Sequence, residues 1–237
     1  MNFIIYEKTV FLTIIVINML TRYGTDNIIV MLAISAILII VALIFTKGWM
    51  MLLPGVPGVV LLVFTLWFFR DPDRVVPHEA IEDKSIVVSP ADGRVVQIID
   101  IENEFIGGKA KQISIFLSPL DVHVNRIPFS GIVKHFAYYP GRYMVAWDER
   151  ASLDNEQTHI FVESGEGKVF FKQIVGVLAR RLVWDIKEGD TVEVGQRFGM
   201  MKFGSRMDII VDKESEIFVK VGESTIAGES ILCKLKK

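Results

Sequence analysis

The residues best suited to covalent chemistry are a glycine and a serine that stand side by side near the end of the chain, Gly204 and Ser205. Glycine has no Cβ, so its carbonyl can be strained and closely approached. The hydroxyl of the next residue can attack that carbonyl in an N-to-O acyl shift. Elimination from the ester would leave dehydroalanine, which hydrolyses to an N-terminal pyruvoyl group. The pair is also an ordinary turn dipeptide, so its context must decide.

Two earlier segments place titratable groups at turns between predicted strands. Asp92 lies in Ser89-Pro-Ala-Asp-Gly-Arg94, and His123 lies in Leu117-Ser-Pro-Leu-Asp-Val-His-Val-Asn-Arg-Ile-Pro128. Each has a structural alternative. Aspartate before glycine is a common turn former, and a histidine in an alternating run is often a hydrogen-bonded structural residue. Both residues are therefore candidates whose roles depend on where the fold places them.

Arginine side chains are candidates for binding a phosphate or carboxylate, because the guanidinium offers a planar fork of donors. The candidates are Arg126, Arg180, Arg181 and Arg206, and each taken singly is more often a surface charge. The histidines outside the His123 segment show no metal-ligand spacing with one another or with Cys233, so no metal site is expected. A single cysteine also excludes an intrachain disulfide framework.

Charge is distributed unevenly along the 237 residues. The first 69 residues hold five charged side chains, Glu7, Lys8, Arg22, Asp26 and Lys47. The remaining residues have the charge density of an ordinary globular domain. This pattern excludes both a wholly soluble enzyme and a wholly transmembrane protein. The net charge of −2, without a long basic run, gives no electrostatic footprint for nucleic acid.

The apolar segment, residues 1–69, is predicted to form two or three membrane-associated helices. Residues 28–45 carry no charge and are long enough to cross a hydrocarbon core of about 30 Å. A second uncharged run covers residues 48–69, and its prolines and glycines restrict the expected helix to about residues 59–69. Residues 10–20 fit an interfacial helix or an imperfect span. A cleavable signal peptide is disfavoured because a longer apolar run follows the first.

The positive residues around this hairpin predict its orientation. Arg22 lies on one side together with Arg70 and Arg74, whereas Lys47 stands alone at the tip. Positive residues favour the cytoplasmic side of a membrane. We therefore expect the protein in the cell membrane, with its large domain, residues 70–237, facing the cytoplasm. The number of membrane spans stays open.

Residues 70–237 read as a mainly β domain, a compact barrel of barrel-sandwich-hybrid type. Strand-like runs rich in Val, Ile and Phe alternate with Gly, Pro and Asp turn signals. The clearest runs are residues 85–88, 94–99, 112–117, 132–138, 159–163 and 168–174. Residues 178–184 fit either a helical turn or a further strand. The strands are expected to be short and strongly bent.

A weak internal repeat near the end of the chain predicts two similar corners. Gly189 and Gly195 bracket one copy, and Gly222 and Gly228 bracket the other. Glycine at such corners permits positive φ. The unit is similar to the corners of biotinyl and lipoyl carrier domains, which suggests a second class of function: a non-catalytic, membrane-tethered carrier or binding module. The spacing from Gly195 to Lys202 is, however, shorter than the carrier pattern requires.

Taken together, the motifs resemble phosphatidylserine decarboxylase in its short, membrane-anchored (type A) form. Besides the segments around Asp92, His123 and Ser205, the resemblance rests on Phe68-Phe-Arg-Asp-Pro72, Asn155-Glu156, Val177-Leu-Ala-Arg-Arg181 and Phe203-Gly-Ser-Arg206. It covers the chain from about Trp67 to its end, with the motifs in the family's order.

The resemblance implies a proenzyme that cuts itself between Gly204 and Ser205. The products would be a β chain of residues 1–204 and an α chain of residues 205–237, which begins with a covalent pyruvoyl cofactor derived from Ser205. A phosphatidylserine-type membrane lipid would form an imine with this group and lose carbon dioxide, giving the ethanolamine lipid. Other pyruvoyl decarboxylases act on soluble amino acids and would not need the membrane anchor.

The resemblance also implies that Asp92, His123 and Ser205 form a relay, in which His123 takes the Ser205 proton and Asp92 fixes the imidazole tautomer. Longer family members have two histidines three residues apart in this segment, whereas the second position here is Arg126. Whether His123 serves both self-cleavage and decarboxylation stays open, as does the choice between acyl and isoprenoid ether tails in the lipid. A homodimer is compatible with an exposed β edge.

Overall fold

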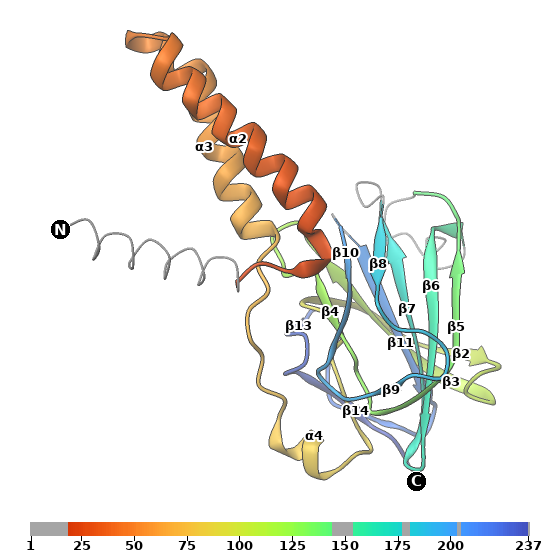
Figure 1. Ribbon diagram of the computed structural model, residues 1–237. Coiled ribbons are helices and arrows are strands. Elements are labelled where there is room, and N and C mark those ends of the chain that lie inside the picture. Colours follow the sequence, from red (N-terminus) through yellow and green to blue (C-terminus); the bar gives the residue numbers. More distant parts are fainter. Residues whose placement is uncertain (1–18, 144–153, 177–180, 203–204, 237) are drawn as a thin grey trace. The chain divides into compact units, whose positions relative to one another are not determined.

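The computed structural model describes residues 19–143, 154–176, 181–202 and 205–236, which belong to two units, Met1–Pro72 and Asp73–Lys237 (Figure 1). The first unit contains two long helices, and the second consists mainly of β-strands. Each unit has its own internal packing. The boundary falls three residues after the predicted one.

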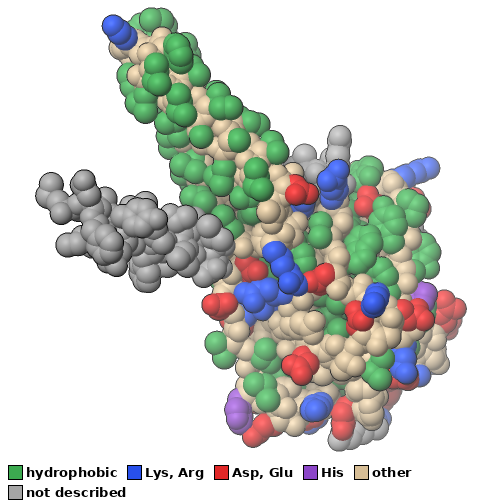
Figure 2. Space-filling view, in the orientation of Figure 1, with side chains coloured by type: hydrophobic (Ala, Val, Ile, Leu, Met, Phe, Trp, Pro, Cys, Tyr) green, Lys and Arg blue, Asp and Glu red, His purple; other side chains and the backbone are tan. Residues whose placement is uncertain are grey.

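The first unit is a helical hairpin. Its helices are α2 (Thr25–Phe45) and α3 (Leu52–Phe68), preceded by the 3-10 helices η1 (Arg22–Gly24) and η2 (Gly48–Met51). Two stretches are long and apolar enough to cross a membrane, Arg22–Phe45 with a mean hydropathy of 3.4 and Gly48–Phe68 with 2.1. Hydrophobic side chains cover the visible surface of the hairpin (Figure 2). This finding confirms the prediction of two apolar helices. The third predicted segment, residues 10–20, lies outside the described residues except for its last two.

Helix α3 begins earlier than predicted. It starts at Leu52 rather than near Val59. Pro54 lies in the first turn, where a backbone N–H has no helical partner to lose, and the helix continues through Pro57. Gly58 has another function there: a Cβ at this position would lie 2.9 Å from Ile39 Cγ1. The close approach lets the Ser35 hydroxyl donate a 2.7 Å hydrogen bond to the Gly58 carbonyl and join the two helices.

The second unit is built around a curled eight-stranded sheet in the order β13-β2-β3-β11-β7-β6-β5-β9 (Figure 1). All of its neighbouring strands are antiparallel. The bounds of these strands are β2 (Gly93–Asn103), β3 (Gly108–Leu117), β5 (Gly131–Tyr139), β6 (Gln157–Ser164), β7 (Gly167–Val175), β9 (Thr191–Val192), β11 (Ser205–Asp212) and β13 (Ser224–Thr225). Five of the six predicted strand runs lie in this sheet, and the sixth, residues 85–88, forms a strand of a smaller sheet. Several strands are longer than expected.

Two three-stranded sheets complete the domain. One has the order β4-β10-β8 and the other β1-β14-β12. Their bounds are β1 (Ile86–Val88), β4 (Val124–Arg126), β8 (Leu182–Trp184), β10 (Arg197–Met201), β12 (Glu216–Ile217) and β14 (Ile231–Lys234), and a short helix, α4 (His78–Glu82), precedes β1. Of the segment predicted as a helical turn or a strand, the described part is β8. The mainly β, barrel-like prediction is thus confirmed.

The hydrophobic core lies against the inner face of the eight-stranded sheet. Alternate residues of β11, such as Met207 and Ile209, point into it. The rings of Phe171 in β7 and Phe198 in β10 meet edge to face with centroids 5.6 Å apart. This contact places the β4-β10-β8 sheet over the inner face. Residues on that face between the two sheets are therefore enclosed.

The predicted repeat is a real structural repeat. Gly189, Gly195, Gly222 and Gly228 have φ values of 92°, 80°, 94° and 76°, in the left-handed region that favours glycine. In one copy the Gly189 N–H binds the Val133 carbonyl and the Gly195 N–H binds the Ile127 carbonyl. In the other copy, the Gly222 N–H binds Val95 and the Gly228 N–H binds Ser89 in the same manner. Each corner thus fastens the start of one long strand, β5 or β2.

Candidate active site

Ser205 occupies the first position of β11, the strand between β3 and β7. It lies opposite Leu117 on one side and Val175 on the other. Its side chain points to the inner face with Met207, is 0 % exposed, and its hydroxyl has no hydrogen-bond partner among the described residues. The predicted scissile partner, Gly204, lies outside the described residues. The structure therefore places the candidate nucleophile in an enclosed position and leaves its hydroxyl available.

His123 is held close to the segment that leads to Ser205. It directly precedes β4, which pairs with β10, and its carbonyl accepts a 3.2 Å hydrogen bond from Met201 N. Only four positions separate Met201 from Ser205, a span of at most about 14 Å. His123 is 0 % exposed, as is Ser205. Residues that are 82 positions apart in the sequence are thus brought to one end of the sheet.

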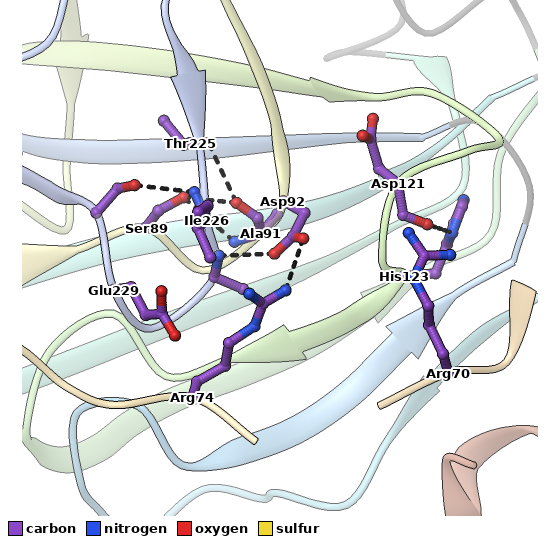
Figure 3. Close-up of polar contacts among 12 residues, drawn as sticks. Arg70, Arg74, Ser89, Ala91, Asp92, Asp121, His123, Thr225, Ile226 and Glu229 are labelled. Carbon is purple, nitrogen blue, oxygen red and sulfur yellow. Dashed lines mark hydrogen bonds and ion pairs between the residues drawn. The ribbon is translucent and has the colours of Figure 1, made fainter. Parts of the chain in front are cut away.

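The tautomer of His123 follows from its backbone contact. Its Nδ1 lies 2.8 Å from the Asp121 carbonyl oxygen (Figure 3). A carbonyl can only accept, so Nδ1 carries the proton, and in the neutral ring Nε2 has the lone pair. A neutral imidazole with its lone pair on Nε2 can act as a general base.

Asp92 takes part in a different set of contacts. One of its carboxylate oxygens forms a 2.7 Å ion pair with Arg74, and the other accepts a 2.8 Å hydrogen bond from Ala227 N (Figure 3). The residue predicted to fix the His123 tautomer is therefore bound to an arginine and a corner of the backbone. The Asp121 carbonyl contacts Nδ1 of His123, and the relay role of Asp92 stays a prediction.

The contact of Asp92 with the corner has a counterpart in the other repeat copy. There, Ser130 Oγ accepts a 2.9 Å hydrogen bond from Val194 N. Both acceptors stand one residue before the glycine that opens the long strand, Gly93 or Gly131. A serine hydroxyl thus suffices for this corner contact, and the negative charge of Asp92 is additional to it.

The described arginine candidates differ in their burial and in their contacts. Arg206 is 2 % exposed, its Nε lies 2.6 Å from Asp208 in a buried ion pair, and its guanidinium also donates a 2.9 Å hydrogen bond to Ser114 Oγ. Arg126 is 6 % exposed and donates a 3.0 Å hydrogen bond to the Gly195 carbonyl. These contacts hold strands and corners together. Arg181 is exposed, with its carbonyl 3.4 Å from Lys202 N, and Arg180 lies outside the described residues.

Several polar residues on the inner face were not predicted as site residues. Thr158 and Gln173 stand opposite each other on β6 and β7 and are fully buried. They are joined to Asn125, also fully buried, by hydrogen bonds of 2.9 Å. The sequence signal was a polar side chain at an inward position of an otherwise apolar strand, which is costly unless the group is satisfied or used.

Glu156 continues this polar row one step closer to the end of the sheet. It is 6 % exposed, and its carbonyl accepts a hydrogen bond from Val175 N, the residue directly opposite Ser205. The pKa of Tyr138 is raised by burial and by the neighbouring Glu156 carboxylate. The end of the inner face that holds Ser205 therefore carries amide, hydroxyl and carboxyl groups rather than apolar side chains alone.

Two observations bear on what the site could hold. A buried hydroxyl at the start of β11 that has no partner among the described residues is compatible with a residue that is converted into a prosthetic group, because none of these residues would lose a hydrogen bond when the hydroxyl leaves. Lys202 is only 7 % exposed, whereas a carrier lysine must project from an exposed tip. Within the described ranges, no group of three or more His, Cys, Asp and Glu side chains is arranged to hold a metal.

Comparison with known proteins finds a matching family and similar named sequences. A family model described as phosphatidylserine decarboxylase matches residues 61–233. A protein of Salinibacter ruber is 49% identical over 176 residues, which cover 73% of this chain and 77% of that protein. One of Chlorobium limicola is 43% identical over 218 residues, covering 91% of this chain and 100% of that protein. Both carry the name phosphatidylserine decarboxylase proenzyme.

Proposed function

Because the chain belongs to the phosphatidylserine decarboxylase family, we propose that it is a proenzyme that cuts itself between Gly204 and Ser205 and then decarboxylates the serine headgroup of a membrane phospholipid. The observation that carries the proposal is the enclosed Ser205 hydroxyl, which has no partner among the described residues and stands at the first position of a central strand. A structural serine in this position would be expected to satisfy its hydroxyl.

In the proposed self-cleavage, Ser205 Oγ attacks the preceding carbonyl carbon while Nε2 of His123 takes the hydroxyl proton. The peptide C–N bond then breaks, and the proton passes to the departing amine of Ser205. Loss of the Cα proton and of the ester oxygen gives dehydroalanine and a carboxylate at residue 204. Addition of water and release of ammonia leave the pyruvoyl group. Asp92 is the proposed third member of the relay, and its negative charge would favour the imidazolium form of His123.

The pyruvoyl ketone would condense with the amine of the substrate and supply the electron sink for loss of carbon dioxide. The chain's own residues would position the headgroup and move protons. His123, with its Nδ1 proton fixed by Asp121, is placed to give and take a proton at Nε2. The exposed Arg181 is the arginine candidate best able to reach a lipid phosphate, since Arg126 and Arg206 are engaged inside the domain.

We further propose that the helical hairpin anchors the enzyme in the cell membrane with the β domain in the cytoplasm. The hairpin has the length and composition of two spans, and the positive residues Arg22, Arg70 and Arg74 flank it on the side of its two ends. A reporter protein that is active only in the cytoplasm should be active when it is fused to the C-terminus. Activity of an exclusively periplasmic reporter at the same position would reverse the orientation.

Mass spectrometry of the expressed full chain tests the central proposal. We expect two fragments, with the C-terminal one beginning at a pyruvoyl group in place of Ser205 and the N-terminal one ending in the carboxylate of Gly204. The variant Ser205→Ala should remain a single chain. Its matched control is Ser215→Ala, which removes another buried hydroxyl without a partner among the described residues, and this variant should still be cleaved. A folded wild-type chain of full mass contradicts the proposal.

A further inference from the structure

A buried amide group on β4 offers a hydrogen-bond donor that the described residues do not use. Asn125 is 0 % exposed, and its Nδ2 has no hydrogen-bond partner among them. Its Oδ1 accepts a 2.9 Å hydrogen bond from Gln173 Nε2. The Thr158 hydroxyl in turn donates to Gln173 Oε1 at 2.9 Å. This chain of two hydrogen bonds fixes the amide so that its oxygen is taken and its NH₂ group is presented.

The register of the strands places this donor beside the candidate active site. Gln173 lies two residues from Val175 on β7, and Val175 is directly opposite Ser205. Side chains two residues apart on a strand share one face, and diagonal neighbours on adjacent strands are about 7–8 Å apart. Asn125, which contacts Gln173, is therefore held over the same part of the inner face as Ser205.

The same alternation links Asn125 to His123. The two residues are separated by Val124 alone, so their side chains leave the extended segment on the same side. That segment is fixed on β10 by the pairing of Val124 with Met200 and by the hydrogen bond from Met201 N to the His123 carbonyl. A base, a nucleophile and a neutral donor thus converge on one enclosed region.

We propose that Asn125 Nδ2 donates a hydrogen bond to the oxyanion that forms when the Ser205 hydroxyl attacks the preceding peptide carbonyl. This inference rests on the proposed function. In that step the bond from Ser205 Oγ to the carbonyl carbon forms, the carbonyl electron pair moves to its oxygen, and the hydroxyl proton goes to His123. A fixed donor in an enclosed site stabilises such a charge far more than water would.

Within this proposal, Asn125 is a catalytic residue, and Gln173 and Thr158 are positioning residues that act through it. This role would explain why three buried polar side chains lie in a row on the inner face of the sheet. A neutral amide suits the task because its donor is available at every pH at which His123 can act as a base. The hydrogen bonds through Gln173 and Thr158 would therefore orient the Asn125 donor before negative charge develops on the carbonyl oxygen.

The test is the rate of self-cleavage of the full chain, synthesised in a cell-free system with phospholipid nanodiscs and followed by denaturing electrophoresis after a pulse of label. Asn125→Leu removes the donor and should slow cleavage roughly 100-fold, the usual effect of losing one oxyanion donor. Asn125→Asp keeps the acceptor for Gln173 but replaces the donor by an oxygen, so it should slow cleavage at least as much. Thr158→Val should slow cleavage less, because it only loosens the alignment.

The matched control is Gln112→Leu, which removes another buried amide from the same sheet. Gln112 pairs with Ile210 and Ile99 on the opposite face, where it donates to Ser114 Oγ, and its variant should cleave at the wild-type rate. Thermal unfolding shows which variants are folded. A folded Asn125→Asp or Asn125→Leu protein that cleaves at the wild-type rate overturns the inference, as does equal slowing in Gln112→Leu. Absence of cleavage in the wild type would instead refute the proposed function.

Discussion

Burial of the Ser205 hydroxyl separates it from bulk solvent, so a protein group is the expected acceptor of its proton. His123 is equally buried, and its tautomer is fixed by the Asp121 carbonyl, which leaves Nε2 as the acceptor. The hydroxyl forms no hydrogen bond with the described residues, so in the proposed reaction the proton-transfer contact would form during the attack. In the proposed precursor, both groups are therefore enclosed in the domain before the attack.

The charge of Asp92 can be separated from its contact with the corner. Because Ser130 fills the equivalent place in the other repeat copy, Asp92→Ser should keep the hydrogen bond to Ala227 N while losing the ion pair with Arg74. We expect a folded protein, destabilised by about 1 kcal/mol, that cleaves itself at least 10-fold more slowly. Chain separation on a denaturing gel and thermal unfolding measure the two effects. Cleavage of Asp92→Ser at the wild-type rate would mean that Asp92 contributes only its hydrogen bond to the corner.

His159 should make stability depend on pH. Burial lowers its pKa to about 4, with Lys172 and His135 adding to the shift. The unfolded chain takes up the proton near pH 6.5, whereas the folded chain resists it. This contribution is therefore complete above pH 6.5 and is lost as the pH falls from 6.5 towards 4. His159→Gln should flatten the fall in melting temperature over this range, and the exposed His78→Gln should leave it unchanged. If the melting temperature fell equally steeply with pH in the wild type and in His159→Gln, His159 would not be the source of the pH dependence.

The types of the site residues could be predicted, but their contacts could not. Ser205, His123 and Asp92 stand out because nucleophile, base and acid occur at turns within recognisable motifs. The Asp121 carbonyl that orients His123 leaves no mark in the side-chain sequence, since every residue has a carbonyl. Arg206 looked available for a phosphate because the sequence does not show that Asp208 and Ser114 would be its neighbours.

At the scale of elements, the repeated corners are what the sequence predicted best. Glycine is required where φ is positive, so the spacing from Gly189 to Gly195 and from Gly222 to Gly228 indicated equivalent turns. The start of α3 was predicted too late, because proline was treated as a helix breaker although Pro54 lies in the first turn. The pairing of β11 with β3 and β7 depends on residues far apart in the chain, and local patterns carry no information on such partners.

Two corner glycines should differ in their tolerance of a methyl group. Both Gly189 and Gly195 have positive φ, so alanine costs each about 1–2 kcal/mol of conformational strain. A Cβ at Gly189 meets nothing within 4 Å, whereas at Gly195 it would lie 2.3 Å from Val76 Cγ2. Gly195→Ala should therefore lower the free energy of unfolding by about 1–3 kcal/mol more than Gly189→Ala, as measured by chemical denaturation. Equal losses would mean that Val76 moves aside at no cost.

For the whole molecule, the membrane boundary and the proposed covalent boundary fall in different places. The units divide at residue 72, whereas the proposed cut precedes residue 205. The proposed α chain would comprise β11, β12, β13 and β14. Three of these strands pair with strands of the proposed β chain, β11 with β3 and β7, β13 with β2, and β14 with β1, whereas β12 pairs with β14. Because Ser205 opens β11, breaking the bond before it spares the hydrogen bonds of both neighbouring ladders.

The two proposed chains should therefore stay together after cleavage. We expect them to co-elute in size-exclusion chromatography in mild detergent and to separate only under conditions that unfold the β domain. Removing β11 would expose the inner strands β3 and β7 at once, and their apolar faces with them. Dialysis of the short chain away from folded protein, without denaturant, would contradict this expectation.

The repeated corner gains a second meaning when the chain is divided at residue 204. The corner from Gly189 to Gly195 fastens Ile127 and Val133, all within the longer product, so it stays an internal clasp. The corner from Gly222 to Gly228 fastens Ser89 and Val95, which then belong to the other product. One and the same motif would thus serve once as tertiary structure and once as a subunit interface. This interface is complete, with its partners already in register, before the subunits exist as separate molecules.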